Sequence, residues 1–289
     1  MTPFEFDDLV RRIGDEILAR MGGAVSSGAA SAVAAANACG CNPAPALKPS
    51  SAAAGNDNAG HWSPPKEGIA GLMDHTLLRP DATERDIVTL CQEARQHSFA
   101  AVCIHPAWVA RAVRELRGST VKTAAVIGFP HGATVTPAKC AETEQVLKLG
   151  AVEIDVVVQI GALKAGDLDA VYSDLRPVVD LAHSAGAAVK AILEMGCLGE
   201  EQKIHGCVLA KLAGADFVKT STGFGPSGAK VHDVALARRV VGAETGIKAA
   251  GGIRSFEDFR AMMAAGATRI GASAGVEILR QAAAPAFRG

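Results

Sequence analysis

Two lysines in similar surroundings are the residues of this sequence best suited to amine chemistry. Lys219 ends a short apolar stretch and is followed by small residues that lead to Gly223, and Lys248 ends a similar stretch that leads to a pair of glycines. Lysine is seldom buried, and burial beside a like charge favours the neutral amine, which can attack a carbonyl carbon. Both lysines are therefore candidates for a carbonyl-binding amine. The alternative is that each lysine merely ends its strand and points into solvent.

The composition allows a large core and excludes several classes of partner. Of the 289 residues 49% are hydrophobic and 20% are charged, which fits one large domain or two small ones. The net charge of -1, without a basic run longer than a pair, argues against nucleic acid. No stretch has the length of a membrane span, and the acidic N-terminus, residues 1–8, is not a secretory signal.

The cysteines and histidines predict neither disulfides nor a metal site. Seven cysteines, an odd number without a C-x-x-C pair, indicate reduced thiols and a cytoplasmic protein. The eight histidines are scattered, and no two share a metal-ligand spacing. We therefore expect no metal and no cofactor.

Three segments of different composition follow one another along the chain. In residues 1–21, apolar residues recur at spacings of three and four, which predicts an amphipathic helix over residues 4–21 that needs a partner surface. These apolar residues are Phe6, Leu9, Val10, Ile13, Ile17 and Met21. Residues 22–65 are mainly Ala, Gly, Ser, Asn and Pro and predict a flexible linker. Residues 66–289 form the third segment, in which apolar strands alternate with amphipathic helices.

The alternation in residues 66–289 predicts eight βα units and hence a (β/α)8 TIM barrel. A doubly wound open sheet is the alternative, and it is less favoured because no Gly-x-Gly-x-x-Gly follows the first strand. Thr136 before Pro137 and the Ser255-x-x-Asp258 pattern indicate helix starts. The expected strands are Gly68 to Met73, Ala100 to Ile104, Lys122 to Ile127, Val152 to Val158, Ala188 to Leu193, Phe217 to Thr220, Ile247 to Ala250 and Arg269 to Gly271.

Charged residues on consecutive strands of such a barrel can meet in one pocket. Asp155 lies inside the apolar fourth strand, Lys190 is on the fifth, and Lys219 and Lys248 are on the sixth and seventh. Neighbouring strands are about 5 Å apart, and barrel enzymes carry their chemistry at the C-terminal strand ends. We expect these four residues to share a site. The alternatives are an ordinary ion-pair partner for Asp155 and an outward-facing Lys190.

Glycines after the last two strands predict a phosphate site. Gly251 and Gly252 follow the seventh strand, and Gly271 and Ser273 follow the eighth. Loops in these positions of a barrel commonly bind phosphate through backbone N–H groups at a helix N-terminus. Ordinary strand-to-helix turns are the alternative interpretation.

These motifs resemble those of the deoxyribose-phosphate aldolases, a class I aldolase family, over about residues 68–280. The motifs are Asp74 to Leu78, Val102 to Pro106, Gly128 to Gly132, Glu153 to Asp155, Asp216 to Phe224, Lys248 to Arg254 and Arg269 to Ser273. The resemblance implies that Lys219 forms the Schiff base and that Asp155 and Lys248 transfer protons. The implied reaction is reversible cleavage of 2-deoxyribose 5-phosphate to glyceraldehyde 3-phosphate and acetaldehyde.

The same resemblance implies the residues that bind the sugar phosphate and the aldehyde. They are Asp74, Thr76, Cys103, Lys190, Thr222, Gly223, Gly251, Gly252, Gly271 and Ser273. The last five of these would hold the phosphate. A homo-oligomer, namely a dimer, is the expected assembly.

The sequence departs from the family pattern at three places. Gln159 stands where many relatives have asparagine, and Met195 follows Glu194 where threonine is common. Some relatives end in a tyrosine that helps the proton step, whereas the only tyrosine here is Tyr172. Alternative functions are another Schiff-base aldolase or transaldolase on a different sugar phosphate, or a non-catalytic phosphate-binding barrel.

The N-terminal segment resembles the encapsulation peptides of bacterial microcompartment enzymes, which are short amphipathic helices on flexible linkers. This resemblance implies that residues 4–21 bind shell proteins and that the enzyme lies in the cytoplasm or inside a microcompartment. A shell could retain acetaldehyde, which is volatile and reactive. A self-associating helix and a dispensable tail are the alternatives.

Overall fold

The computed structural model describes residues 6, 8, 10–17, 19, 62–65 and 68–284 of the chain. The linker predicted over residues 22–65 lies outside the described residues except for 62–65.

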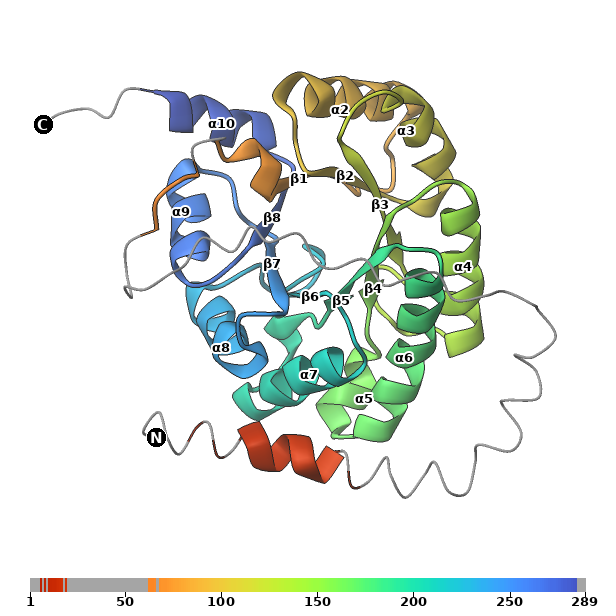
Figure 1. Cartoon of the computed structure of the whole chain (residues 1–289), viewed down its shortest axis with the longest axis vertical. Helices are drawn as coiled ribbons and strands as arrows, with labels where there is room; N and C mark the ends of the chain where they lie inside the picture. Colours follow the sequence, from red (N-terminus) through yellow and green to blue (C-terminus); the bar gives the residue numbers. More distant parts are fainter. Residues whose placement is uncertain are drawn as a thin grey trace, which may run out of the picture.

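Eight parallel strands close into a barrel in which each strand pairs with its neighbours in chain order, and β1 also pairs with β8 (Figure 1). The predicted (β/α)8 barrel is therefore confirmed. The strands are β1 (Met73–Leu77), β2 (Ala101–Ile104), β3 (Lys122–Ile127), β4 (Glu153–Val157), β5 (Ala188–Ile192), β6 (Phe217–Lys219), β7 (Gly246–Ala250) and β8 (Arg269–Ala272).

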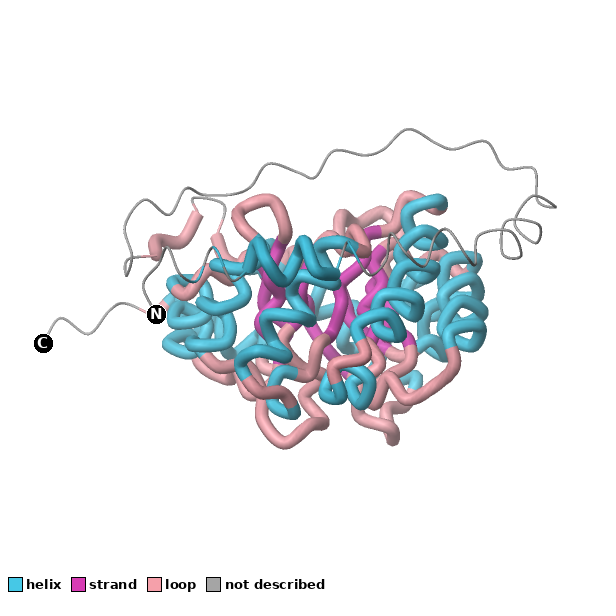
Figure 2. The backbone as a smooth tube through the Cα atoms, turned by 90° about the horizontal axis from the view of Figure 1, so that it is seen from below, coloured by secondary structure: helices cyan, strands magenta, loops and turns pink. Residues whose placement is uncertain are grey.

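Helices surround the strands on all sides, as the side view in Figure 2 also shows. They are α2 (Glu84–His97), α3 (Val109–Glu115), α4 (Thr136–Lys148), α5 (Ile160–Ala165), α6 (Leu168–Ser184), α7 (Glu200–Leu212), α8 (Val231–Val241), α9 (Phe256–Ala264) and α10 (Gly275–Ala283). Short 3-10 turns are η1 (Ala70–Leu72), η2 (Pro106–Trp108) and η3 (Met195–Cys197). In the part of the chain that is described, no helix is long and apolar enough to cross a membrane.

Side chains alternate between the two faces of the barrel wall because successive residues of a strand point to opposite sides. On β2, Val102 and Ile104 belong to the large apolar cluster that joins strands and helices. Ala101 and Cys103 belong to a small separate cluster that contains Leu78, Ala124 and Val126. The same alternation turns every second residue of the charged strands into the barrel interior.

The first strand begins five residues later than the prediction. Residues 68–73 were expected to form it, but Ala70–Leu72 form η1, and β1 runs from Met73 to Leu77. The prediction was wrong because it followed the apolar run and placed the polar residues after the strand. Those polar residues are the strand itself, since Asp74 faces charged partners inside the barrel. The other seven strands agree with their predicted bounds to within one residue at each end.

The two predicted helix starts have different outcomes. Ser255 caps α9 as predicted, with its hydroxyl accepting from the Asp258 backbone N–H at 3.0 Å in a reciprocal capping box. Thr136 was expected to cap α4, but Val135 is the cap residue and Thr136 is the first helical residue. The Thr136 hydroxyl donates instead to Asp174 at 2.9 Å.

The N-terminal helix packs on the outside of the barrel. Residues 10–17 are helical, and Phe6, Ile13 and Ile17 are buried in the main apolar cluster. The guanidinium of Arg239, on α8, lies 3.8 Å from the centre of the Phe6 ring. In Figure 1 this helix is the red segment. The partner surface that its apolar face needs is thus supplied by the barrel.

Candidate active site

The barrel interior holds a group of charged side chains that we call the buried ion cluster. Six of its seven members are at most 2% exposed. The members are Asp74 on β1, Glu153 and Asp155 on β4, Lys190 on β5, Lys219 on β6, Lys248 on β7 and Arg269 on β8. All of them occupy inward positions of their strands, so the barrel places acids from β1 and β4 opposite bases from β5 to β8.

Asp155 is the acid around which three lysines of this cluster gather. Its Oδ1 accepts from Lys190 Nζ at 2.7 Å. Its Oδ2 accepts from Lys219 Nζ at 2.8 Å and from Lys248 Nζ at 2.7 Å. The four residues predicted to share a site therefore do so, and the alternative of an outward-facing Lys190 is wrong. Register explains the meeting, because Asp155 pairs with Lys190 and Lys219 pairs with Lys248 across neighbouring strands.

A second set of contacts lies deeper in the barrel and supports the first. Asp74 accepts from Arg269 at 2.6 Å and lies 2.5 Å from Lys248 Nζ. Glu153 lies 2.6 Å from Lys190 Nζ. The Arg269 guanidinium also lies 5.6 Å from the centre of the Phe217 ring. These contacts fix the positions of Lys190 and Lys248, the two lysines that bind Asp155 together with Lys219.

The acids of the cluster are held in their charged form. Burial alone would raise the pKa of Asp155, but the ammonium groups of Lys190, Lys219 and Lys248 outweigh burial and hold that pKa well below its ordinary value. Burial likewise opposes ionisation of Asp74, and the charges of Lys248 and Arg269 lower its pKa nevertheless. Both carboxylates therefore stay ionised at neutral pH.

Two of the lysines are held protonated by these acids. Burial would lower the pKa of Lys248, but Asp155 and Asp74 raise it well above the ordinary value. Asp155 and Glu153 raise the pKa of Lys190 in the same way. With three carboxylates against Lys190, Lys248 and Arg269, the cluster is neutral when the remaining member, Lys219, carries no charge. Each acid of the cluster thus has a cationic partner without Lys219.

An apolar wall faces the lysines. Cys103 on β2 contributes its thiol, whose Sγ lies 3.6 Å from Asp155 Oδ2. Burial raises the pKa of this thiol, so it stays protonated. Around it lie the small apolar side chains of the separate interior cluster, against which Phe129 packs. Such a wall suits a small apolar group of a ligand.

Glycine-rich loops cover the same end of the barrel. Gly223, Gly251 and Gly252 have positive φ angles of 88°, 87° and 79°. A Cβ on Gly251 would lie 3.3 Å from Gly223 Cα, so the loops after β6 and β7 touch. Ser273 is exposed before the N-terminus of α10. The backbone N–H groups of these loops can approach an anion closely.

Other predicted residues lie in different surroundings. Gly271 is inside β8 rather than after it, and a Cβ there would lie 2.9 Å from Lys248 Cε. Thr76 is half-buried on β1, and its hydroxyl donates to the Asp74 carbonyl. Tyr172 lies on α6, outside the strands. Because a Cβ at position 271 would meet the Lys248 side chain, the glycine there leaves room for that side chain.

The sequence analysis missed two members of the cluster, Glu153 and Arg269. Both belong to motifs that resemble the aldolase family, but no role was predicted for either residue. The period of a strand could have found them, because Glu153 precedes Asp155 by two residues and Arg269 precedes Gly271 by two. Their side chains consequently face the same interior.

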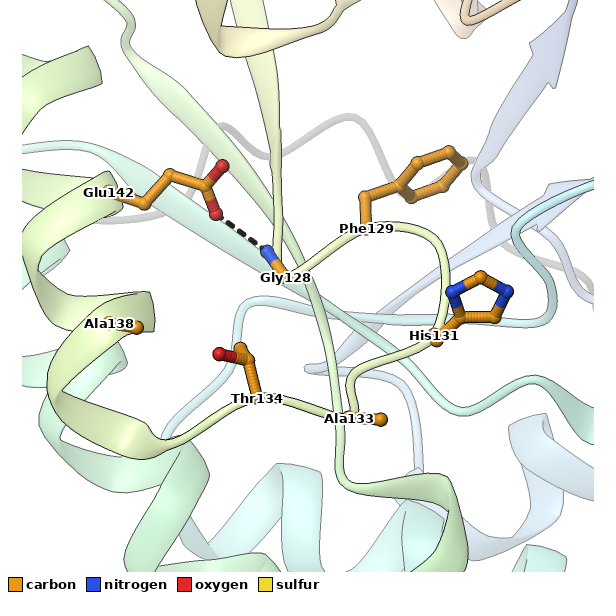
Figure 3. Close-up of a pocket in the computed structure, with 7 residues that line it drawn as sticks. All are labelled: Gly128, Phe129, His131, Ala133, Thr134, Ala138 and Glu142. Atoms are coloured by element: carbon orange, nitrogen blue, oxygen red, sulfur yellow. Dashed lines mark hydrogen bonds between the residues drawn. The ribbon is translucent and has the colours of Figure 1, made fainter. Parts of the chain in front are cut away.

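A cavity of about 460 Å³ lies beside the barrel mouth, between the loop after β3 and α4. Figure 3 shows Phe129 and His131 on this loop and Glu142 on α4, where Glu142 accepts from the Gly128 backbone N–H at 2.7 Å. None of its lining residues belongs to the buried ion cluster. The cavity contains no lysine and is therefore not the candidate active site.

Comparison with known proteins agrees with this geometry. Residues 69–284 match the sequence profile of the DeoC/LacD family aldolases. The chain belongs to this family. The matched region of this DeoC/LacD aldolase contains every strand and the whole buried ion cluster.

Similar proteins include two curated enzymes and a solved structure. The deoxyribose-phosphate aldolase of Thermococcus gammatolerans is 55% identical over 216 residues, which cover 74% of this chain and 96% of that protein. That of Geobacillus sp. strain WCH70 is 51% identical over 214 residues, with the same coverages. The tetrameric deoxyribose phosphate aldolase from Aeropyrum pernix is 36% identical with a TM-score of 0.70, covering 74% of this chain and 90% of that one.

Proposed function

We propose that this DeoC/LacD aldolase cleaves 2-deoxyribose 5-phosphate reversibly to glyceraldehyde 3-phosphate and acetaldehyde through a Schiff base on Lys219. The observation that carries the proposal is the contact of Asp155 Oδ2 with both Lys219 and Lys248 inside the barrel. Curated relatives that are 51% and 55% identical in sequence are named deoxyribose-phosphate aldolase.

The neutral amine of Lys219 would attack the aldehyde carbon of the open-chain sugar and form a carbinolamine. Loss of water then gives an iminium ion on Lys219. A base removes the proton of the C3 hydroxyl, the bond between C2 and C3 breaks, and its electron pair enters the iminium to give an enamine. Glyceraldehyde 3-phosphate leaves. Protonation of the enamine carbon and hydrolysis then release acetaldehyde and restore the amine.

Asp155 and Lys248 are the groups placed to move these protons. Asp155 is an ionised acceptor in contact with Lys219, and Lys248 is a protonated donor bound to the same oxygen. A base and an acid that share one hydrogen bond can deliver and recover a proton without bulk solvent. The only tyrosine of the sequence, Tyr172, lies on α6, so we assign the proton steps to these two residues.

A substrate panel tests the activity directly. The chain should release acetaldehyde from 2-deoxyribose 5-phosphate, and an alcohol dehydrogenase assay measures this acetaldehyde. It should turn over fructose and ribulose phosphates at least about 100-fold more slowly. The apolar side chains around Cys103 suit the methyl group of acetaldehyde better than the hydroxymethyl group of a ketose donor. Preference for a ketose phosphate would indicate another Schiff-base aldolase or a transaldolase. Binding without any turnover would indicate a phosphate-binding barrel.

We further propose that the N-terminal segment, residues 4–21, binds the shell proteins of a microcompartment, and that the chain assembles as a homo-oligomer. Its apolar face is already in contact with the barrel, where Phe6 lies under Arg239 and Ile13 and Ile17 are buried. One face cannot bind two surfaces at once. Shell binding therefore requires the segment to leave the barrel.

This competition predicts opposite effects for two substitutions. Phe6→Ala removes apolar area from the helix and should reduce co-purification with shells, whereas Arg239→Ala weakens only the barrel side and should increase it about two- to tenfold. Arg11→Ala, at an exposed position, is the matched control. Co-purification that is unchanged by Phe6→Ala and by deletion of residues 1–21 would refute shell binding.

A further inference from the structure

Glu194 has a backbone conformation that is unfavourable for its residue type. It follows β5, and its φ and ψ are 53° and 59°, in the left-handed region. Ser98 is the other non-glycine residue with positive φ among the described residues, and it is an exposed helix C-cap. Such backbone strain persists where the surroundings enforce it, and it is common at functional sites.

The carboxylate of Glu194 is also in an unfavourable place. The residue is 2% exposed, and within the described ranges no cationic side chain lies within ion-pair distance of it. Its Oε2 accepts from the backbone N–H of Thr222 at 3.3 Å and from the Thr222 hydroxyl. Its Oε1 has no hydrogen-bond partner. A buried carboxylate with so few partners costs free energy, which suggests a role other than stability.

These contacts tie Glu194 to the loop that leaves Lys219. The backbone on either side of Glu194 is bonded to β6 and the residue after it, through Leu193 N to Lys219 O at 3.1 Å and Met195 N to Thr220 O at 2.8 Å. The Thr222 hydroxyl also accepts from the backbone N–H of Phe224 at 3.0 Å. One carboxylate oxygen therefore fixes both ends of the turn that contains Gly223.

Close packing limits the turn further. A Cβ on Gly225 would lie 2.6 Å from the carboxyl carbon of Glu194, so this glycine fits directly against the carboxylate. Gly223, inside the turn, touches Gly251 of the loop after β7. The conformation of the proposed phosphate loop thus depends on Glu194. A carboxylate repels a phosphate anion, so Glu194 can assist phosphate binding only through Thr222.

We propose that Glu194 is a positioning residue that acts through Thr222 to hold the loop after β6 in its phosphate-binding conformation. The role of Glu194 rests on the proposed function, because it assigns Gly223 to the phosphate. This positioning role predicts that glutamine can replace glutamate at position 194. The amide oxygen can accept both Thr222 hydrogen bonds, and the amide nitrogen then takes the place of the unpartnered Oε1.

The test compares Glu194→Ala with Glu194→Gln. Loss of two hydrogen bonds to the loop should raise KM for 2-deoxyribose 5-phosphate about tenfold or more in Glu194→Ala, while Glu194→Gln stays within about twofold of wild type. The kcat/KM for 2-deoxyribose, which lacks phosphate, should be unchanged in both variants. Thr222→Val removes the hydroxyl that bonds both Glu194 and Phe224, so it should also raise this KM, and the double variant should lose less than the product of the two single losses because both act through the Glu194–Thr222 contact.

Binding of inorganic phosphate, measured by calorimetry, separates this role from the reaction itself. Its Kd should rise about tenfold in Glu194→Ala and not in Glu194→Gln, whether or not the wild-type chain turns over a sugar. Wild-type chain that binds phosphate but forms no Schiff base would overturn the proposed function alone. An equal loss in Glu194→Gln, an equal loss on 2-deoxyribose, or additive effects in folded variants would overturn the positioning role.

Discussion

Lys219→Ala should abolish turnover of 2-deoxyribose 5-phosphate, with a fall in kcat/KM on the order of 10⁴-fold or more, because the covalent intermediate cannot form. Borohydride added with acetaldehyde should reduce the iminium and leave a stable two-carbon adduct on Lys219 of the wild-type chain. Peptide mass spectrometry locates the adduct. The variant should show none.

Two other buried lysines of the same chain are internal controls for this labelling. Lys248 lies within the same cluster, but Asp155 and Asp74 raise its pKa, so it is protonated and not nucleophilic. Lys139 is equally buried and pairs with Asp174, outside the cluster. Both should remain unlabelled. An adduct on either of them, or turnover that survives Lys219→Ala, would overturn the assignment of the Schiff base.

Ligand binding by Lys219→Ala distinguishes the enzyme from a binding protein. The proposed phosphate loops are made by backbone of Gly223, Gly251 and Gly252, which the substitution leaves in place. We expect the variant to bind glyceraldehyde 3-phosphate with a Kd close to that of the wild-type chain. Binding would then survive while all turnover is lost. A non-catalytic barrel would bind equally in both forms and turn over in neither.

The sequence predicted most of the barrel because its strands are short apolar runs bounded by glycines and helix signals. Seven strands agree to within one residue. The first did not, because Asp74, His75 and Thr76 are three consecutive polar residues, so neither face of the strand has an apolar pattern, whereas the acids of β4 alternate with apolar residues. A burial pattern set by ion pairing is visible only once the partners from β4 to β8 are in place.

Part of the candidate site could likewise be predicted from the sequence, and part could not. Asp155, Lys190, Lys219 and Lys248 could be grouped from sequence, because all four lie on consecutive strands of a recognisable barrel. Glu194 could not be given a role, because its effect depends on a left-handed backbone and on a loop 28 residues further along the chain. The sequence likewise showed that the N-terminal helix needs a partner surface, but not that the outside of the barrel supplies it.

Asp155→Asn should have the second largest effect, since it removes the carboxylate that three lysines share. We expect kcat/KM to fall about 10²- to 10⁴-fold through loss of the proton acceptor. Two or three buried ammonium groups would also lose their counter-charge, which should lower the free energy of unfolding by about 3–5 kcal/mol. Urea unfolding at pH 7 measures the stability, and kinetics per folded molecule measure the chemistry.

Asp174→Asn is the matched control, because Asp174 is the acid of the other buried lysine pair, with Lys139. This variant should also lose stability, but its kcat should remain close to wild type since neither residue touches the cluster. A fall in kcat as large as that of Asp155→Asn would mean that the catalytic loss reflects damaged folding rather than missing chemistry.

The pH dependence of stability gives the Asp155→Asn prediction a definite sign. In the wild-type chain the pKa of Asp155 is depressed, so its contribution is complete above the unfolded value of about 3.9 and is lost only as pH falls towards the folded value. The pKa values of Lys190 and Lys248 are raised, so their contribution is complete below about 10.4 and is lost only above that pH. Stability attributable to these groups should therefore be level between about pH 5 and 9.

Without Asp155, burial becomes the stronger influence on the lysines, and their folded pKa values should fall below the unfolded value. The unfolded chain then binds more protons than the folded chain, so the stability of Asp155→Asn should rise with pH between about 7 and 10. Urea midpoints across this range, compared with those of Asp174→Asn, measure the difference. A flat profile for Asp155→Asn would show that the charges of Lys190 and Lys248 do not depend on this carboxylate and are balanced by Glu153 and Asp74 instead.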